Sequence, residues 1–80
     1  MTFDGQPYYG NKPYFTVGIP NQWFEEGFFL FEGKIYKYRD DRSAAHYHVE
    51  QPGFSEEEFL AYAEQEKIEI PEAFIEAMEG

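Results

Sequence analysis

The residues in this chain that are best suited to chemistry are carboxylates, and they are concentrated near its C-terminal end. Residues 50 to 80 hold ten acids and one base, Lys67, a net charge of −9, whereas residues 1 to 49 hold six acids and five bases, a net charge of −1. This distribution disfavours direct binding to nucleic acid or to an anionic membrane, because both require basic patches. It favours a partner with a basic surface.

Three of the glutamates recur at helical spacing. At about 100° per residue, Glu72, Glu76 and Glu79 fall within a stripe about 60° wide. Neighbouring like charges cost a helix a few tenths of a kcal/mol per pair, and no lysine offsets them there. The stripe is either a solvated face that aids solubility or a surface presented to a basic partner. Carboxylates about 4.5 to 6 Å apart along a helix axis lie on the scale of backbone phosphates, so the second interpretation predicts a nucleic-acid decoy.

An aromatic pair lies beside further acidic residues in the first half of the chain. Trp23 and Phe24 directly precede Glu25 and Glu26, and aromatics beside charge suit a protein interface. The residues expected to contact a partner are Glu57, Glu58, Glu64, Glu69, Glu72, Glu76, Glu79, Trp23 and Phe24.

A weaker pattern suggests a metal. His46, His48 and Glu50 alternate along one expected strand, so their side chains point to the same face. Three such ligands could hold zinc or another transition ion if a fourth ligand or water completed the shell. The chain has no cysteine and no other histidine, so the more conservative interpretation is a pair of edge-strand histidines beside acidic helices.

The sequence contains no recognisable set of catalytic residues. Ser43 and Ser55 are the only serines, and Ser55 is better explained as a helix cap, so no serine, histidine and acid set stands out. The glycines follow no phosphate-loop spacing. A two-layer domain of this size seldom encloses a substrate pocket of several hundred Å³. We therefore expect a non-enzymatic protein without a cofactor.

The elements that must position these residues belong to one expected domain, 1–80. It divides into an irregular N-terminal arm at 1–12, a β-meander at 13–50 and an acidic helical pair at 55–80. Nine Phe, seven Tyr and one Trp provide the apolar area that a small folded domain needs. The absence of cysteine and of any apolar run of about 20 residues favours a cytoplasmic protein.

The meander should contain three or four antiparallel strands. A strand at 13–18 ends in a turn at 19–22, and a hairpin follows with Glu32 and Gly33 as its two-residue turn. A second turn at 40–43 precedes a strand at 44–50. The hairpin turn predicts that Phe31 pairs with Lys34, Leu30 with Ile35, and Phe29 with Tyr36.

Both faces of this hairpin are apolar. One face carries Phe28, Leu30 and Ile35, and the other carries Phe29, Phe31, Tyr36 and Tyr38. Two short helices can cover only one of them. The other must be covered by the arm with Tyr8 and Tyr9, by a second copy of the chain in a homodimer, or by a partner.

The first helix should run from about 56 to 66. Ser55 and Glu58 form a capping box, and Phe54 and Phe59 occupy the positions of a hydrophobic staple. The residues that this helix should bury are Phe59, Leu60 and Ala63.

The second helix should run from about 71 to 79, because Pro71 suits a first helical position. Its expected buried residues are Phe74, Ile75, Ala77 and Met78. Both helices should pack on one face of the sheet, which makes the fold α+β.

The preferred hypothesis is a small acidic inhibitor that occupies the basic surface of a nucleic-acid-handling protein. In physical type this is a nucleic-acid mimic of the anti-CRISPR or anti-restriction kind that phages encode. Two alternatives stay open. One is an adaptor or structural subunit that uses an aromatic sheet face for protein contact or homodimerisation, and the other is a metal-binding domain centred on His46 and His48.

Overall fold

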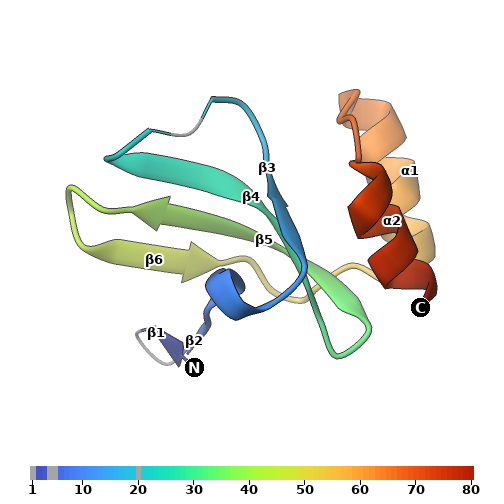
Figure 1. The fold of residues 1–80 in the computed structure, drawn as a ribbon, viewed down its shortest axis with the longest axis horizontal. Coiled ribbons are helices and arrows are strands. Elements are labelled where there is room, and N and C mark those ends of the chain that lie inside the picture. The colour runs from blue at the N-terminus through green and yellow to red at the C-terminus, as the bar shows by residue number, and fades with distance from the viewer. Residues whose placement is uncertain (1, 4–5, 20) are drawn as a thin grey trace.

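The computed structural model describes residues 2–3, 6–19 and 21–80. Its main sheet is antiparallel, with four strands in the order β3, β4, β5 and β6, and two C-terminal helices follow the sheet (Figure 1). The elements of this body are β3 (Tyr14–Thr16), β4 (Phe24–Phe31), β5 (Lys34–Asp41), β6 (His46–Val49), α1 (Glu56–Glu66) and α2 (Glu72–Glu79). The arrangement confirms the expected α+β fold.

The hairpin of β4 and β5 forms in the expected register. The pairs are Phe31 with Lys34, Leu30 with Ile35, and Phe29 with Tyr36. Glu32 and Gly33 form its turn with φ angles of 51° and 81°. Positive φ at both central residues gives a turn whose twist matches that of the flanking strands, which is why glycine is favoured there.

The strand boundaries differ from expectation around the second turn. β5 continues through Asp41 instead of ending before a turn at 40–43, and β6 covers only His46–Val49 of the expected strand at 44–50. The ladder continues because Asp40 pairs with Tyr47 and Asp41 with His46. β3 is likewise shorter than 13–18, and the expected turn at 19–22 includes Pro20, which lies outside the described residues.

The N-terminal arm is more ordered than the expected irregular segment. β1 (Thr2–Phe3) pairs antiparallel with β2 (Gln6–Pro7), and a turn of 3-10 helix, η1, covers Tyr9–Asn11. Met1, Asp4 and Gly5 of this arm lie outside the described residues. The consequence is that Tyr8 and Tyr9 are held against the main sheet.

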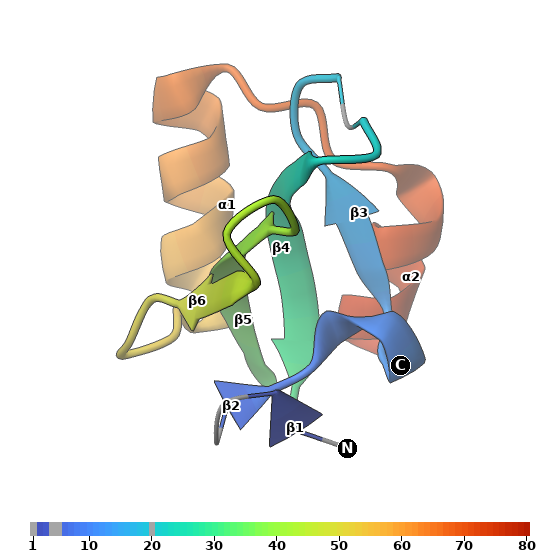
Figure 2. The same cartoon turned by 90° about the vertical axis from the view of Figure 1, so that its left-hand side faces the viewer.

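One face of the sheet packs against the helices through a cluster that we call the phenylalanine layer. Its buried members are Phe15, Phe28, Ile35, Phe59 and Phe74. The rings of Phe15 and Phe74 lie 4.8 Å apart edge to face, and those of Phe28 and Phe59 lie 5.0 Å apart. Figure 2 shows the helices side by side, with α1 on the side of β5 and β6 and α2 on the side of β3.

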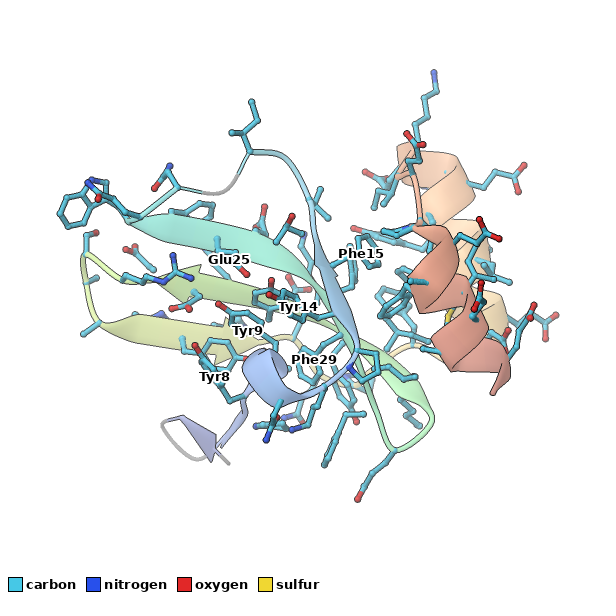
Figure 3. All side chains as sticks on the ribbon, viewed as in Figure 1. Tyr8, Tyr9, Tyr14, Phe15, Glu25 and Phe29 are labelled. Carbon is cyan, nitrogen blue, oxygen red and sulfur yellow. The ribbon has the colours of Figure 1, made fainter. Side chains whose placement is uncertain are left out.

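The opposite face carries a second cluster, the tyrosine layer. Its buried members are Tyr9, Phe29, Tyr38, Tyr47 and Val49. Tyr9 stacks on Tyr38 with 4.0 Å between ring centroids, so the arm covers the second apolar face of the hairpin. In Figure 3, Phe15 points toward the helices while Tyr8, Tyr9 and Phe29 lie on the other side of the sheet.

Glycine is required at position 27 of β4, where β3 and the Tyr38 side chain pack closely against the strand. A Cβ atom at this position would lie 2.1 Å from the Phe15 carbonyl oxygen and 3.0 Å from the Tyr38 ring. Glycine therefore allows β3 and the Tyr38 ring to approach the backbone of β4 closely.

The helices agree with expectation in their extent but less well in what they bury. α1 has the expected bounds, yet Leu60 is 43% exposed, so the prediction that it is buried is wrong. α2 begins at Glu72 with Pro71 as its N-cap residue. Only Phe74 is fully buried, and the other expected core residues, Ile75, Ala77 and Met78, are half-buried.

Candidate functional site

The start of α1 is fixed by local hydrogen bonds. The Glu58 backbone N–H donates to Ser55 Oγ at 3.2 Å, and the Ser55 backbone N–H donates to Glu58 Oε1 at 2.9 Å. The backbone bond from Ser55 holds the pKa of the Glu58 carboxyl below its usual value. The rings of Phe54 and Phe59 lie 6.1 Å apart, as a hydrophobic staple requires. This confirms the predicted capping box and fixes which face of α1 meets the sheet.

The burial of α2 sets the direction of its glutamates. Phe74 is 3% exposed and packs on Phe15 and Phe59. Positions about 140° to 200° around a helix from Phe74 are those of Glu72, Glu76 and Glu79. All three are exposed, so the stripe faces away from the sheet.

The same reasoning applies to α1, where Glu57 and Glu64 lie opposite Phe59. Because Phe59 and Phe74 both pack on one face of the sheet, the two glutamate stripes point outward from the same layer (Figure 2). We call this region the acidic helix surface. It comprises Glu57, Glu58, Glu64, Glu69, Glu72, Glu76 and Glu79, all of them exposed.

The carboxylates of the acidic helix surface form no direct ion pair within the part of the chain that the structure describes. Among the described residues, no Lys or Arg nitrogen lies within 4.0 Å of a carboxylate on α1 or α2, and neither helix has a basic residue in its last turn. On the sheet, by contrast, Arg42 pairs with Glu25 at 2.9 Å and approaches Asp40 at 3.6 Å. Lys37 Nζ lies 3.9 Å from Glu50. In the described ranges, Arg42 and Lys37 thus pair with acids of the sheet, whereas the helices have no direct ion pair and the charge of Lys34 acts on Glu58 only at longer range.

Leu60 adds an apolar side chain to this surface. It lies three residues after Glu57 and four before Glu64, so it occupies the same flank of α1. A single exposed leucine is ordinary in a small protein. Its place among these carboxylates nevertheless adds an exposed apolar side chain to the acidic helix surface, which the sequence pattern did not reveal.

The aromatic pair lies elsewhere. Trp23 is 59% exposed and directly precedes β4, and the start of β4 lies at the end of the sheet away from the helices (Figure 1). The Arg39 guanidinium lies over the ring of Phe24, 4.8 Å from its centroid, which leaves Phe24 half-buried. The structure therefore separates Trp23 and Phe24 from the acidic helix surface.

The histidines lie together without forming a metal site. His46 and His48 are exposed on β6, with their ring centroids 6.4 Å apart. The carboxylate of Glu50 approaches Lys37. Within the described residues, no three His, Cys, Asp or Glu side chains converge closely enough to hold a metal ion.

A buried polar network under the arm was missed by sequence reasoning. The Tyr9 hydroxyl donates to Asp40 Oδ2 at 3.0 Å and accepts from Arg42 Nη2 at 3.1 Å. Arg42 Nη2 also donates to Glu25 Oε1 at 2.9 Å, and the Tyr38 hydroxyl donates to Glu25 Oε2 at 2.7 Å. Asp40 is only 5% exposed, although the sequence pattern placed it in a turn. The usable signal was the alternation of Tyr36, Tyr38 and Asp40, which continues one strand face.

The chemistry of this network is structural. Burial, and then the bond to Glu25, raise the pKa of Tyr38 far above its usual value. Burial likewise raises the pKa of Tyr9, and the bond to Glu25, followed by that to Tyr9, raises the pKa of Arg42. These groups keep fixed protonation states at neutral pH and hold each other in place, so they are unsuited to proton transfer.

In the described part of the chain, neither helix is long and apolar enough to cross a membrane. No family model, curated protein or solved structure matches this chain.

Proposed function

We propose that this chain is a cytoplasmic protein-binding inhibitor whose acidic helix surface occupies the nucleic-acid-binding surface of another protein. The observation that carries the proposal is the uneven pairing of charge. Acids on the sheet have basic neighbours, whereas the exposed glutamates of α1 and α2 have none within ion-pair distance among the described residues. Such a surface should be attracted strongly to a basic partner, because its carboxylates are not already paired with bases of the same chain.

The spacing of the charges supports a decoy for nucleic acid. Glu72, Glu76 and Glu79 lie about 6 and 4.5 Å apart along the axis of α2. Successive phosphates of one DNA strand advance by about 3.4 Å along the duplex axis. The carboxylates are thus one to two phosphate steps apart along the axis, a separation that long, flexible Lys and Arg side chains can span. The chain itself would not bind nucleic acid, since its net charge is −10.

Two other functions have less support. An adaptor that uses the aromatic sheet face would need that face free, but Tyr9 stacks on Tyr38 and covers it. A metal-binding role would need a third ligand beside His46 and His48, and the described residues provide no such cluster.

The test compares two double variants that change the net charge equally. Glu72→Lys with Glu76→Lys alters the acidic helix surface, and Asp41→Lys with Glu50→Lys alters acids at the end of β5 and directly after β6. Each protein is immobilised and exposed to nuclease-treated lysate of the source cell. Captured proteins are then measured for binding to fluorescent duplex DNA while free chain is added.

The wild type and the sheet variant should displace DNA at similar concentrations, and the helix variant should need at least about tenfold more, which corresponds to about 1.4 kcal/mol. Displacement should weaken steeply as salt rises. Equal displacement by the two variants, or no effect of salt, would show that the acids only aid solubility.

A further inference from the structure

A groove lies where the two helices approach the tip of the β4–β5 hairpin, and it meets the acidic helix surface at one end. Its volume is about 400 Å³. The first residue of α1, the last turn of α2 and the hairpin line it together, and Figure 1 shows these three segments gathered at one end of the molecule. The antiparallel course of α1 and α2 brings the start of one helix beside the end of the other.

The lining of this groove is amphipathic. Leu30, Ile35 and Met78 form an apolar floor, and all three belong to or pack against the phenylalanine layer. Glu56 and Glu79 stand at its rim, one from each helix, and both are exposed. Of the residues that line the groove, two are acidic and none is basic.

The end of α2 adds to the negative character of the groove. Carbonyl groups in the last turn of a helix lack intrahelical partners and favour a nearby cation. α2 has no basic residue in that turn, and of its carbonyls Glu76 accepts a bond from the Gly80 N–H at 2.9 Å. A cation from outside the chain would meet the rim carboxylates and the carbonyl end of α2, while the positive N-terminal end of α1 is offset by the carboxylates of its own first turn, Glu56, Glu57 and Glu58.

We infer that this groove anchors an arginine side chain of the basic partner, an inference that rests on the proposed function and deepens it. An arginine combines an apolar stem with a charged head, so its methylene groups can lie on Met78 and Leu30 while its guanidinium reaches the glutamates at the rim. The planar guanidinium can bind a carboxylate through two parallel hydrogen bonds, which lysine cannot do. Arginine is also enriched among the residues that dominate interface energies.

The test uses a small probe and does not depend on knowing the partner. N-acetylarginine amide is titrated into the full chain at constant ionic strength, and the methyl signals of Met78, Leu30 and Ile35 are followed by NMR. The uncharged isostere N-acetylcitrulline amide is titrated in parallel. Glu79→Gln removes one rim carboxylate, and Glu50→Gln, at a residue that lies beside Lys37 and does not line the groove, is the matched control.

Arginine should shift the three methyl signals saturably in the millimolar range, and citrulline should bind at least about fivefold more weakly. Glu79→Gln should weaken arginine binding severalfold, and Glu50→Gln should leave it unchanged. Equal binding of citrulline would mean that the groove takes an uncharged chain, and shifts on concentrating the protein alone would mean that a second copy fills it. Either result, or no localised shift, would overturn the inference.

Failure here and failure of the proposed function are distinguishable. The DNA-displacement test changes Glu72 and Glu76, neither of which lines the groove. Displacement that depends on these two residues without any arginine shift would leave the acidic helix surface as a partner site and remove the anchoring groove.

Discussion

The phenylalanine layer and the tyrosine layer lie on opposite faces of the same four strands, yet they are held together differently. The phenylalanine layer joins sheet to helices through apolar contacts, such as that of Phe28 with Phe59 at 5.0 Å. The tyrosine layer is covered by the N-terminal arm, which contains one turn of 3-10 helix. The hydroxyls of Tyr9 and Tyr38 in this layer donate hydrogen bonds to Asp40 and Glu25. Buried hydroxyls require hydrogen-bond partners. The stability of the tyrosine layer therefore depends on hydrogen-bond geometry, whereas that of the phenylalanine layer depends on how well apolar side chains fill the space.

This difference also explains where the charge lies. Arg42 binds Glu25 and Tyr9, and its Nη1 donates to the Asn21 carbonyl at 3.0 Å. One of the few basic residues of the chain is therefore committed to the tyrosine layer. The helices that cover the phenylalanine layer need no such partner, and their outer faces remain uncompensated.

The largest expected effect comes from a cavity in the phenylalanine layer. Phe59 is 0% exposed, so Phe59→Ala should lower the free energy of unfolding by about 3 to 5 kcal/mol. Leu60→Ala, the adjacent residue on the exposed side of α1, should cost less than about 1 kcal/mol. Urea unfolding followed by far-UV circular dichroism measures both. A similar loss for the two variants would mean that α1 does not hold its face against the sheet.

A smaller effect is expected from the polar geometry of the tyrosine layer. Tyr9→Phe keeps the ring stacked on Tyr38 but removes a hydrogen bond from Asp40, which stays buried, and this should cost about 1 to 3 kcal/mol. Tyr14→Phe is the matched control, because the Tyr14 ring packs edge to face on the Tyr9 ring but is 44% exposed. It should change stability by less than about 0.5 kcal/mol. Equal losses in urea unfolding would show that the hydroxyl network contributes no specific stability.

The two layers also differ in how far the sequence predicts them. The helices, the hairpin register and the two apolar faces of the hairpin follow from local rules, because a capping box at Ser55 and a turn at Glu32 and Gly33 act over a few residues. The burial of Asp40 and the pairing of Arg42 with Glu25 depend on segments 17 or more residues apart, and Tyr9 is 31 residues from Asp40. The alternation of Tyr36, Tyr38 and Asp40 indicates which strand face Asp40 lies on, but no local pattern specifies its contact with Tyr9 or that of Arg42 with Glu25.

The acidic helix surface could be predicted from the sequence as well as the helices themselves, since its glutamates follow helical spacing. The groove beside it was not. It combines Leu30, Glu56 and Met78 from three elements, and only tertiary packing brings them together. The exposure of Leu60 has the same origin, because the angle at which α1 meets the sheet decides which flank is covered.

The smallest expected effect concerns the cap that begins α1. The pKa of Glu58 is lowered by the Ser55 N–H, so ionised Glu58 stabilises the folded chain above its ordinary pKa of 4.5, and this contribution is lost as pH falls through the lower folded value. Glu58→Gln should therefore lower Tm at pH 7 more than Glu57→Gln, which removes the same charge from the same turn without touching the cap. The difference in Tm between the two variants should shrink below about pH 4.5 and vanish in stronger acid, because the carboxyl is then protonated in both states. Differential scanning calorimetry across this range measures it. A difference that persists unchanged at low pH would assign the stabilisation to side-chain size or helix propensity, and the charge of Glu58 would then contribute nothing to holding α1 over the phenylalanine layer.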